Sequence, residues 1–293
     1  MKQGIIIENI SNIFKIICEN ELYICDARGK LKKEDIKPVV GDKVNFEITK
    51  LEEKTGVIEE ILPRENYIKR PKIANINQMV LVISSKMPKP DLLMLDKQLS
   101  FAEYMNIKPV IVINKIDLSK EIAEEIKEQY KFTNYEIIET NAKENIGIHE
   151  LRNVLKNKIS VFSGNSGVGK STLLNDLFED NLTLEGKISS KNKRGKNTTT
   201  TVKLYELEEN TFIADSPGFS TFDIYEIETT NLAEYFVEFK EHIKNCEFVG
   251  CTHIKEEKCG IKQALKENKI SQNRYERYIK IYEELKDREE HKW

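Results

Sequence analysis

Short apolar runs alternate with polar and turn residues over the N-terminal fifth of the chain. The runs span residues 13–17, 22–25, 42–48 and 56–62. Strands of this length at this spacing are typical of a small β-barrel. A basic turn at residues 28–33 lies between two of them. Such a loop could contact nucleic acid, but a charge run is more often a solvated edge of a barrel.

The pattern changes near Pro63 and Pro71, after which apolar strands alternate with stretches of helical periodicity. The expected strands span residues 78–83, 109–113, 135–139, 159–162 and 211–214. The expected helices span residues 91–105, 120–130, 149–158 and 171–178. This alternation predicts a mostly parallel sheet that is covered by helices on both faces.

The C-terminal part of the chain is expected to be helical. From residue 231 the apolar positions recur every three or four residues, and a second helix is expected to begin near Ser271. The aromatic residues of both helices are expected to form core and not a ligand pocket. The resulting domain limits are residues 1–66, 67–227 and 228–293.

The motif that says most about function is a glycine-rich loop between an expected strand and an expected helix. It matches the pattern G-x-x-x-x-G-K-[ST] at every fixed position. It consists of Gly164, Asn165, Ser166, Gly167, Val168, Gly169, Lys170 and Ser171, with Thr172 next. Inward-facing N–H groups and a helix N-terminus would bind a di- or triphosphate there. Lys170 would reach the β- and γ-phosphates, and the Ser171 hydroxyl would ligate Mg²⁺.

A second motif predicts that the bound base is guanine. Asn114-Lys115-Ile116-Asp117 follows an apolar strand, at the carboxyl end where open α/β sheets bind ligands. The Asp117 carboxylate would accept the ring N–H and the exocyclic amino group of guanine, and adenine offers neither. Asn114 would support the loop, and the Lys115 stem would lie along the base. A third guanine contact is expected from Asn141, Ala142 and Lys143.

Further residues complete the expected hydrolytic site. Asp215 and Gly218 end an apolar strand and would lie near the metal and the γ-phosphate. Thr199, one of four threonines at residues 198–201, would complete the Mg²⁺ shell. The residues expected to act directly in hydrolysis are therefore Lys170, Ser171, Thr199, Asp215 and Gly218.

The order of the motifs is unusual, because the guanine motif precedes the phosphate loop. In ordinary GTPases the phosphate loop comes first. A parallel sheet can keep every strand in place under such a rearrangement, since the termini of a domain usually lie at its surface. The sequence therefore predicts a circularly permuted GTPase domain.

The cysteines are concentrated near the C-terminus. Cys246, Cys251, His253 and Cys259 supply three thiolates and one imidazole. This donor set suits tetrahedral zinc with no open coordination position, so one structural Zn²⁺ is expected. Cys18 and Cys25 lie in strand-like runs and are expected in the core.

The overall charge argues against a global nucleic-acid-binding field. Lys and Arg number 46 against 49 Asp and Glu, a net charge of -3. A local contact remains open, because residues 187–203 carry six basic side chains and no acidic one. No apolar run is long enough for a signal peptide or a membrane span, so a soluble cytoplasmic protein without a membrane partner is expected.

In this order and over the whole chain, the motifs resemble the ribosome small-subunit-dependent GTPase A family. The resemblance rests on residues 114–117, 164–171, 194–200 and 215–218 and on the Cys₃His set. It implies a multidomain α/β protein with an N-terminal OB-fold, a permuted P-loop GTPase domain and a C-terminal helical zinc-binding domain. It also implies binding of GTP and GDP, binding to the 30S subunit late in its maturation, contact with 16S rRNA, and GTP hydrolysis stimulated by that subunit. A monomer is expected.

Two positions depart from what such sites usually carry. Asn197 stands before the threonine run, where the family often has a histidine, and it cannot act as a base at neutral pH. Phe219 stands where many GTPases place the glutamine that orients the attacking water. Slow intrinsic turnover is therefore expected, with a partner completing or ordering the site.

Two alternatives remain open from the residues. The first is a GTP-gated RNA-binding scaffold whose hydrolysis is incidental, and the 30S subunit would not stimulate hydrolysis in that case. The second is a P-loop kinase with a small acceptor, which would have no use for Asn114 and Asp117.

Overall fold

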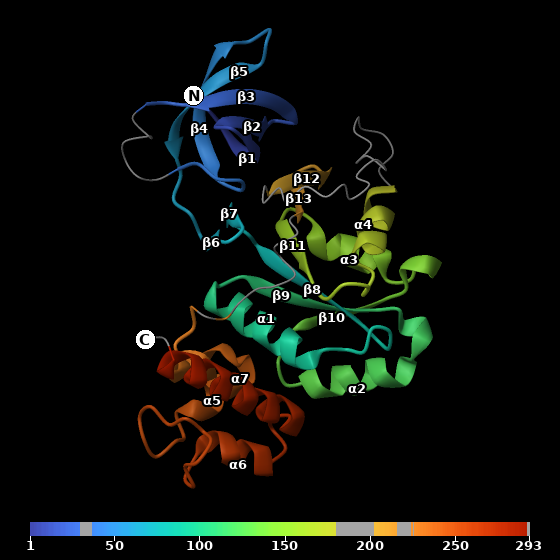
Figure 1. Cartoon of the computed structure of the whole chain (residues 1–293). Coiled ribbons are helices and arrows are strands. Elements are labelled where there is room, and N and C mark those ends of the chain that lie inside the picture. Colours follow the sequence, from blue (N-terminus) through green and yellow to red (C-terminus); the bar gives the residue numbers. More distant parts are fainter. Residues whose placement is uncertain (30–36, 180–201, 216–223, 225, 292–293) are drawn as a thin grey trace. The chain divides into compact units, whose positions relative to one another are not determined.

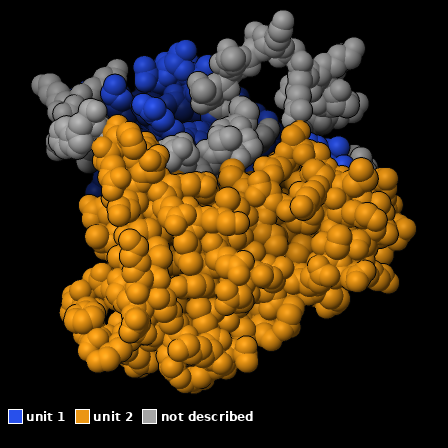
Figure 2. All heavy atoms as spheres, turned by 60° about the horizontal axis from the view of Figure 1, so that its bottom comes forward, with its two compact units in different colours: residues 1–78, 149–162, 171–219 blue, residues 79–148, 163–170, 220–293 orange. Residues whose placement is uncertain are grey.

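The computed structural model describes residues 1–29, 37–179, 202–215, 224 and 226–291. The chain divides into two compact units, coloured separately in Figure 2. The first unit comprises residues 1–78, 149–162 and 171–219. The second comprises residues 79–148, 163–170 and 220–293. Each unit therefore combines segments that are far apart in the sequence.

The N-terminal part of the first unit is a closed five-stranded barrel (Figure 1). Its strands are β1 (Lys2–Ile10), β2 (Ile13–Cys18), β3 (Glu21–Ala27), β4 (Lys43–Lys50) and β5 (Thr55–Ile61). β1 pairs with β2 and β4, and β5 pairs with β3 and β4, so no strand of the ring lacks a neighbour on either side. Cys18 and Cys25 are buried as expected. Strand β1 was not among the predicted runs, because its three consecutive isoleucines do not alternate with polar residues.

A short hairpin follows the barrel where the sequence pattern breaks. It consists of β6 (Tyr67–Lys69) and β7 (Lys72–Ala74). The Arg64 guanidinium donates to both carboxylate oxygens of the buried Asp42, at 2.7 and 2.8 Å. The segment that leads from the barrel into the hairpin is thus held to Asp42, just before β4, by a bidentate ion pair.

The rest of the first unit carries the strands that flank the phosphate loop in sequence. Its elements are α3 (Ile148–Leu155), β11 (Ile159–Ser163), α4 (Lys170–Glu179), β12 (Lys203–Glu208) and β13 (Thr211–Asp215). β11 and β13 are parallel, and β12 is antiparallel to β13. β12 was not predicted, because its glutamates give it a polar appearance. Strand β12 also pairs with β1, and there the Lys203 ammonium nitrogen lies 3.4 Å from a carboxylate oxygen of Glu8.

The second unit contains the remaining central strands. They are β8 (Gln78–Ser84), β9 (Lys108–Asn114) and β10 (Glu136–Thr140), with β9 between the other two and parallel to β10. The accompanying helices are α1 (Leu92–Tyr104) and α2 (Lys120–Tyr130), and the 3₁₀-helices are η1 (Ile116–Leu118) and η2 (Ala142–Glu144). Every residue of β8 is buried, as expected for a strand covered on both faces. The strands and helices predicted here are confirmed to within a few residues.

The C-terminal module is helical as predicted, and its first part consists of short helical elements. Its elements are η4 (Thr229–Tyr235), η5 (Val237–Phe239), α5 (Lys240–Ile243), α6 (Gly260–Lys266) and α7 (Gln272–Glu290). The helical stretch expected from residue 231 is confirmed as a series of short elements, because Phe236 is extended and ends η4. Apolar residues every three positions also suit 3₁₀ turns. The aromatic residues form core as predicted: the Phe236, Phe239 and Tyr278 rings lie 5.1 to 5.2 Å apart.

A buried ionic cluster attaches this module to α1. The Arg274 guanidinium of α7 donates to Asp96 of α1 and to both carboxylate oxygens of Glu238. Arg277 also donates to Asp96, and the Tyr130 hydroxyl donates to the same carboxylate at 2.6 Å. Burial alone would lower the pKa of Arg274, but the charges of Asp96 and Glu238 raise it well above its ordinary value. Arg274 therefore stays charged.

No helix among the described residues is both long and apolar enough to cross a bilayer.

Candidate nucleotide site and metal centre

The phosphate loop follows β11 and leads into α4, the strand, turn and helix order that its motif requires. Gly164 and Gly169 adopt positive φ angles of 141° and 103°. A Cβ atom on Gly164 would lie 2.1 Å from the Val82 carbonyl oxygen, and one on Gly169 would lie 2.2 Å from the Asn114 side-chain nitrogen. Glycine is therefore required at both positions by conformation and by space.

The lysine and serine of the motif lie at the start of α4. The Lys170 ammonium donates to the carbonyl oxygens of Gly164 and Asn165, the latter at 2.9 Å. The lysine thus lies along the loop that would surround the phosphates, at the helix N-terminus. Ser171 and Thr172 are exposed residues, as are Ser166 and Gly167.

The guanine motif is joined to the phosphate loop by its first two residues. Asn114, only 1% exposed, donates to the Val168 carbonyl at 2.9 Å and accepts from the Thr140 hydroxyl at 3.0 Å. The Lys115 ammonium donates to the Gly167 carbonyl at 2.6 Å and to the Met87 carbonyl at 2.8 Å. The structure thereby brings together two motifs that are about 50 residues apart in sequence. Asp117 lies in η1 and is exposed.

The third guanine segment lies at the end of β10, which is adjacent to the guanine-motif strand. Asn141 is buried and forms a bridge with Ile146, with backbone hydrogen bonds of 3.1 Å in both directions. Ala142 is half-buried, and Lys143 is exposed. Both lie in η2, so their backbone N–H groups are at the start of a short helical turn.

The residues expected around the γ-phosphate are only partly described. Asp215 is the last residue of β13, where its Cα faces that of Lys203 across the β12–β13 pair. Thr199 and Gly218 lie outside the described residues, as do Asn197 and Phe219. The basic stretch at residues 187–203 also lies outside the described residues, except for its last two. Of these, Lys203 forms an ion pair with Glu8. Of the basic turn, residues 30–33 are likewise outside.

The motifs did not predict one buried contact at the base of the phosphate loop. The Gln98 amide of α1 donates to the hydroxyl of Ser163, the last residue of β11, at 2.8 Å. Both side chains are buried. The signal in the sequence was a glutamine whose neighbours three and four positions away in an expected helix are apolar, which indicates a satisfied polar group in the core.

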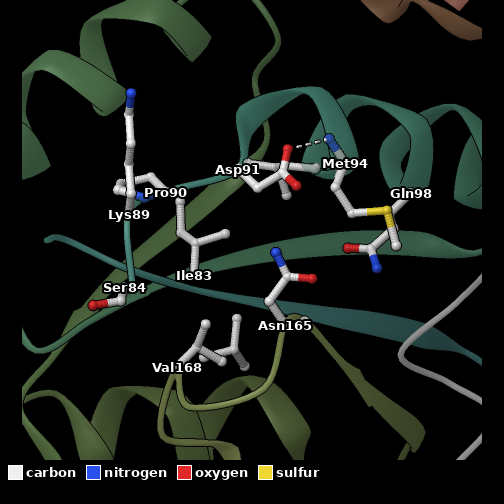
Figure 3. A pocket seen from close by; sticks show the side chains of 12 residues that line it. Ile83, Ser84, Lys89, Pro90, Asp91, Met94, Gln98, Asn165 and Val168 are labelled. Carbon is white, nitrogen blue, oxygen red and sulfur yellow. Dashed lines mark hydrogen bonds between the residues drawn. The ribbon is translucent and has the colours of Figure 1, made fainter. Parts of the chain in front are cut away.

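A small pocket lies beside the phosphate loop in the second unit (Figure 3). Asn165 and Val168 of the loop line one side, and Met94 and Gln98 of α1 line the other. Asp91 caps α1, because its carboxylate accepts the Met94 N–H at 3.0 Å. The cap fixes the first turn of the helix that faces the loop.

The four predicted zinc ligands come together in the C-terminal module. Their donor atoms all lie within 4.8 Å of one another. His253 Nδ1 is 3.5 Å from Cys246 Sγ and 3.4 Å from Cys259 Sγ, and these two sulfurs are 4.0 Å apart. Zinc with ordinary bond lengths at the centre of a tetrahedron requires about 3.6 Å between N and S and about 3.8 Å between sulfurs. Three thiolates and one imidazole at these distances fit a metal ion of this kind. His242 is not part of the group.

Surrounding hydrogen bonds hold the ligand loop in place. Two tyrosine hydroxyl groups of α7 donate to the backbone of the ligand loop. Tyr275 donates to the His253 carbonyl at 2.6 Å, and Tyr278 donates to the Thr252 carbonyl at 2.9 Å. The Glu256 carboxylate accepts from the backbone N–H groups of Thr252, Ile254 and Lys255. Burial raises the pKa of Glu256, but these hydrogen bonds outweigh it and lower the value to about 2. Burial lowers the pKa of His253, which favours the neutral ligating form.

Comparison with known proteins covers nearly the whole chain. Residues 61–225 match the family model described as RsgA GTPase, and residues 3–58 match the RsgA N-terminal domain. A protein of Ruminiclostridium cellulolyticum named small ribosomal subunit biogenesis GTPase RsgA is 40% identical over 98% of this chain and 95% of its own length. A Clostridium acetobutylicum protein of the same name is 42% identical over 99% of this chain and 100% of its own.

Solved structures agree with the sequence relatives. YjeQ from Thermotoga maritima matches with a TM-score of 0.85 and 37% identity, covering 97% of this chain and 98% of that one. YloQ, described as a circularly permuted GTPase, matches with a TM-score of 0.82 and 31% identity, covering 98% and 96%. The circularly permuted GTPase domain that the sequence predicts is therefore confirmed.

Proposed function

The chain belongs to the RsgA GTPase family and is a GTP hydrolase, and we propose that it binds the 30S ribosomal subunit late in its maturation and hydrolyses GTP with stimulation by that subunit. The names of its relatives support a role in biogenesis of the small subunit. The observation that carries the nucleotide part is the pair of hydrogen bonds from Asn114 and Lys115 to carbonyls of the phosphate loop. They make base recognition and phosphate binding parts of one site.

Guanine recognition rests on the end of β9 and the end of β10. The Asp117 carboxylate accepts the ring N–H and the exocyclic amino group of the base, so adenine leaves it unpaired. Asn114 holds the two loops together, and the Lys115 stem covers one face of the base. Asn141, Ala142 and Lys143 supply the third contact, a backbone N–H to the guanine oxygen.

Phosphate binding and hydrolysis rest on the loop from Gly164 to Thr172. Its N–H groups and Lys170 stabilise charge on the β- and γ-phosphates. Ser171 and Thr199 would hold Mg²⁺, which would supply neutralisation of the charge that develops on the phosphate oxygens. Asp215 would support that shell, and Gly218, which lies outside the described residues, would contribute a backbone N–H to the γ-phosphate. Because Phe219 cannot orient a water molecule, unstimulated turnover is slow.

The remaining parts of the chain carry the partner interactions in this proposal. The domains are an OB-fold barrel at residues 1–66, the GTPase at 67–227 and a helical zinc-binding domain at 228–293. Cys246, Cys251, His253 and Cys259 hold one structural Zn²⁺, which supplies no chemistry and stabilises the module. The protein acts in the cytoplasm as a monomer and contacts 16S rRNA.

Single-turnover hydrolysis with and without purified 30S subunits tests the proposal. A stimulation of at least about tenfold is expected with 30S subunits and none with 50S subunits, because only the correct partner completes the site. Lys170→Ala should abolish hydrolysis in both conditions. Equal rates with and without 30S subunits would show that hydrolysis is incidental, as in an RNA-binding scaffold.

A further inference from the structure

Ser85 lies immediately after β8, is fully buried, and belongs to none of the nucleotide-binding motifs. Its backbone N–H donates to the Asn114 carbonyl at 2.9 Å. Its hydroxyl donates to the Lys115 carbonyl at 2.6 Å. One residue therefore holds two consecutive carbonyl groups of the guanine motif.

The Lys115 carbonyl is the point where the guanine loop changes direction. Lys115 adopts the left-handed conformation, with φ 60° and ψ 41°, which is unfavourable for a residue with a Cβ atom. The same carbonyl accepts the Leu118 N–H at 2.9 Å and so closes η1, which contains Asp117. Fixing this carbonyl therefore fixes the turn that carries Asp117.

Asp117 depends on its backbone for its position. Its side chain is exposed, so packing against neighbours contributes little to holding the carboxylate. A carboxylate that accepts two hydrogen bonds from one base edge needs both oxygens aligned, because hydrogen bonds weaken steeply with angle. A small rotation of η1 would cost the second bond first.

Among the residues that the structure describes, the hydrogen bonds that Ser85 donates go to the guanine motif alone. The link to the phosphate loop is made instead by the side chains of Asn114 and Lys115. Loss of the Ser85 hydroxyl should therefore disturb the orientation of the base contact while leaving the phosphate contacts in place.

We propose that Ser85 is a positioning residue for guanine recognition, which fixes the left-handed turn at Lys115 and thereby aligns the Asp117 carboxylate with both N–H donors of the base edge. The inference rests on the proposed function, in which Asp117 binds guanine. It predicts a defect in base discrimination and not in the chemical step.

The test compares GTP with inosine triphosphate, which lacks the exocyclic amino group, in calorimetric titrations with Mg²⁺ present. Ser85→Ala should weaken GTP binding about tenfold, as expected for loss of one buried hydrogen bond, and inosine triphosphate binding about threefold or less. The preference for GTP should thus fall about threefold. The rate of hydrolysis at saturating GTP should stay within twofold of the unmodified protein.

Two further variants keep the test decisive. Ser85→Cys retains the volume of the side chain but replaces a strong donor by a weak one, and it should change the preference in the same direction. Ser100→Ala removes a buried hydroxyl that, within the described part of the chain, donates only to the Asp96 carbonyl of its own helix, at 3.0 Å. It should leave both affinities within twofold.

A failure of the Ser85 role can be distinguished from a failure of guanine recognition. Equal losses for the two nucleotides, or no loss in the Ser85 variants, would overturn the role of Ser85 while GTP binding by the unmodified protein stands. Equal binding of GTP and ATP by the unmodified protein would instead overturn guanine recognition itself.

Discussion

The buried cluster around Arg274 allows a quantitative prediction of stability. Arg274 is 1% exposed, and it donates both hydrogen bonds that the Glu238 carboxylate accepts from the described residues. Arg274→Met removes the cation and leaves Glu238 charged and unpaired, whereas Asp96 retains Arg277 and Tyr130. Breaking a buried ion pair by removing one partner costs about 3 to 5 kcal/mol, since the other charge stays in a region of low dielectric constant.

The assay is urea denaturation followed by circular dichroism, with the free energy of unfolding extrapolated to water. A loss of about 4 kcal/mol corresponds to a decrease in melting temperature of roughly 10 °C for a chain of this size. The double variant Arg274→Met with Glu238→Leu restores the balance of charge, so it should recover at least about 2 kcal/mol of that loss.

A second ion pair between the same helices provides the control. Lys97 of α1 pairs with Glu284 of α7, and the side chain of Glu284 is half exposed. Because water screens such a pair, Lys97→Met should cost less than about 1 kcal/mol. If Arg274→Met costs no more than Lys97→Met, the buried cluster does not anchor the module and the reasoning fails.

Three further predictions concern the nucleotide and metal sites. Gly164→Ala places a methyl group 2.1 Å from the Val82 carbonyl oxygen and should weaken GTP binding at least about tenfold by calorimetry. Gly29→Ala, whose Cβ would meet no described residue within 4 Å, should not change the affinity for GTP. Asp117→Asn should shift the preference from GTP to xanthosine triphosphate, whose second carbonyl group can accept from the new amide, and a kinase-like site indifferent to Asp117 would show no shift. Cys259→Ser should reduce the zinc content, measured by mass spectrometry, below one ion per chain and lower the melting temperature; unchanged stability without zinc would argue against a structural role.

Sequence patterns pointed to the candidate nucleotide and metal residues more readily than to the packing between elements. The phosphate loop and the zinc ligands were found because their chemistry requires particular residue types at short spacings. The positive φ angles of Gly164 and Gly169 show why those positions are glycine. Four of the barrel strands and most of the central elements followed from periodicity, because buried faces repeat with a fixed period.

Contacts between distant segments could not be predicted in this way. Arg274 and Asp96 are 178 residues apart in the chain, and each alone has the appearance of a surface charge. Strand β12 becomes recognisable only through its partners, since it has half of its positions polar. Ser85 was missed for a similar reason, because a buried serine has no periodic or compositional signal until its acceptor carbonyls are located.

The central claim is that one site binds the guanine edge and the triphosphate together, since Asn114 and Lys115 connect the two loops. Calorimetric titration of the unmodified protein with GTP and with ATP, both with Mg²⁺, tests it most directly. One GTP should bind per chain, and ATP should bind at least about a thousandfold more weakly, because its base leaves a carboxylate unpaired. Equal affinity for the two nucleotides, or no binding of either, would contradict the account.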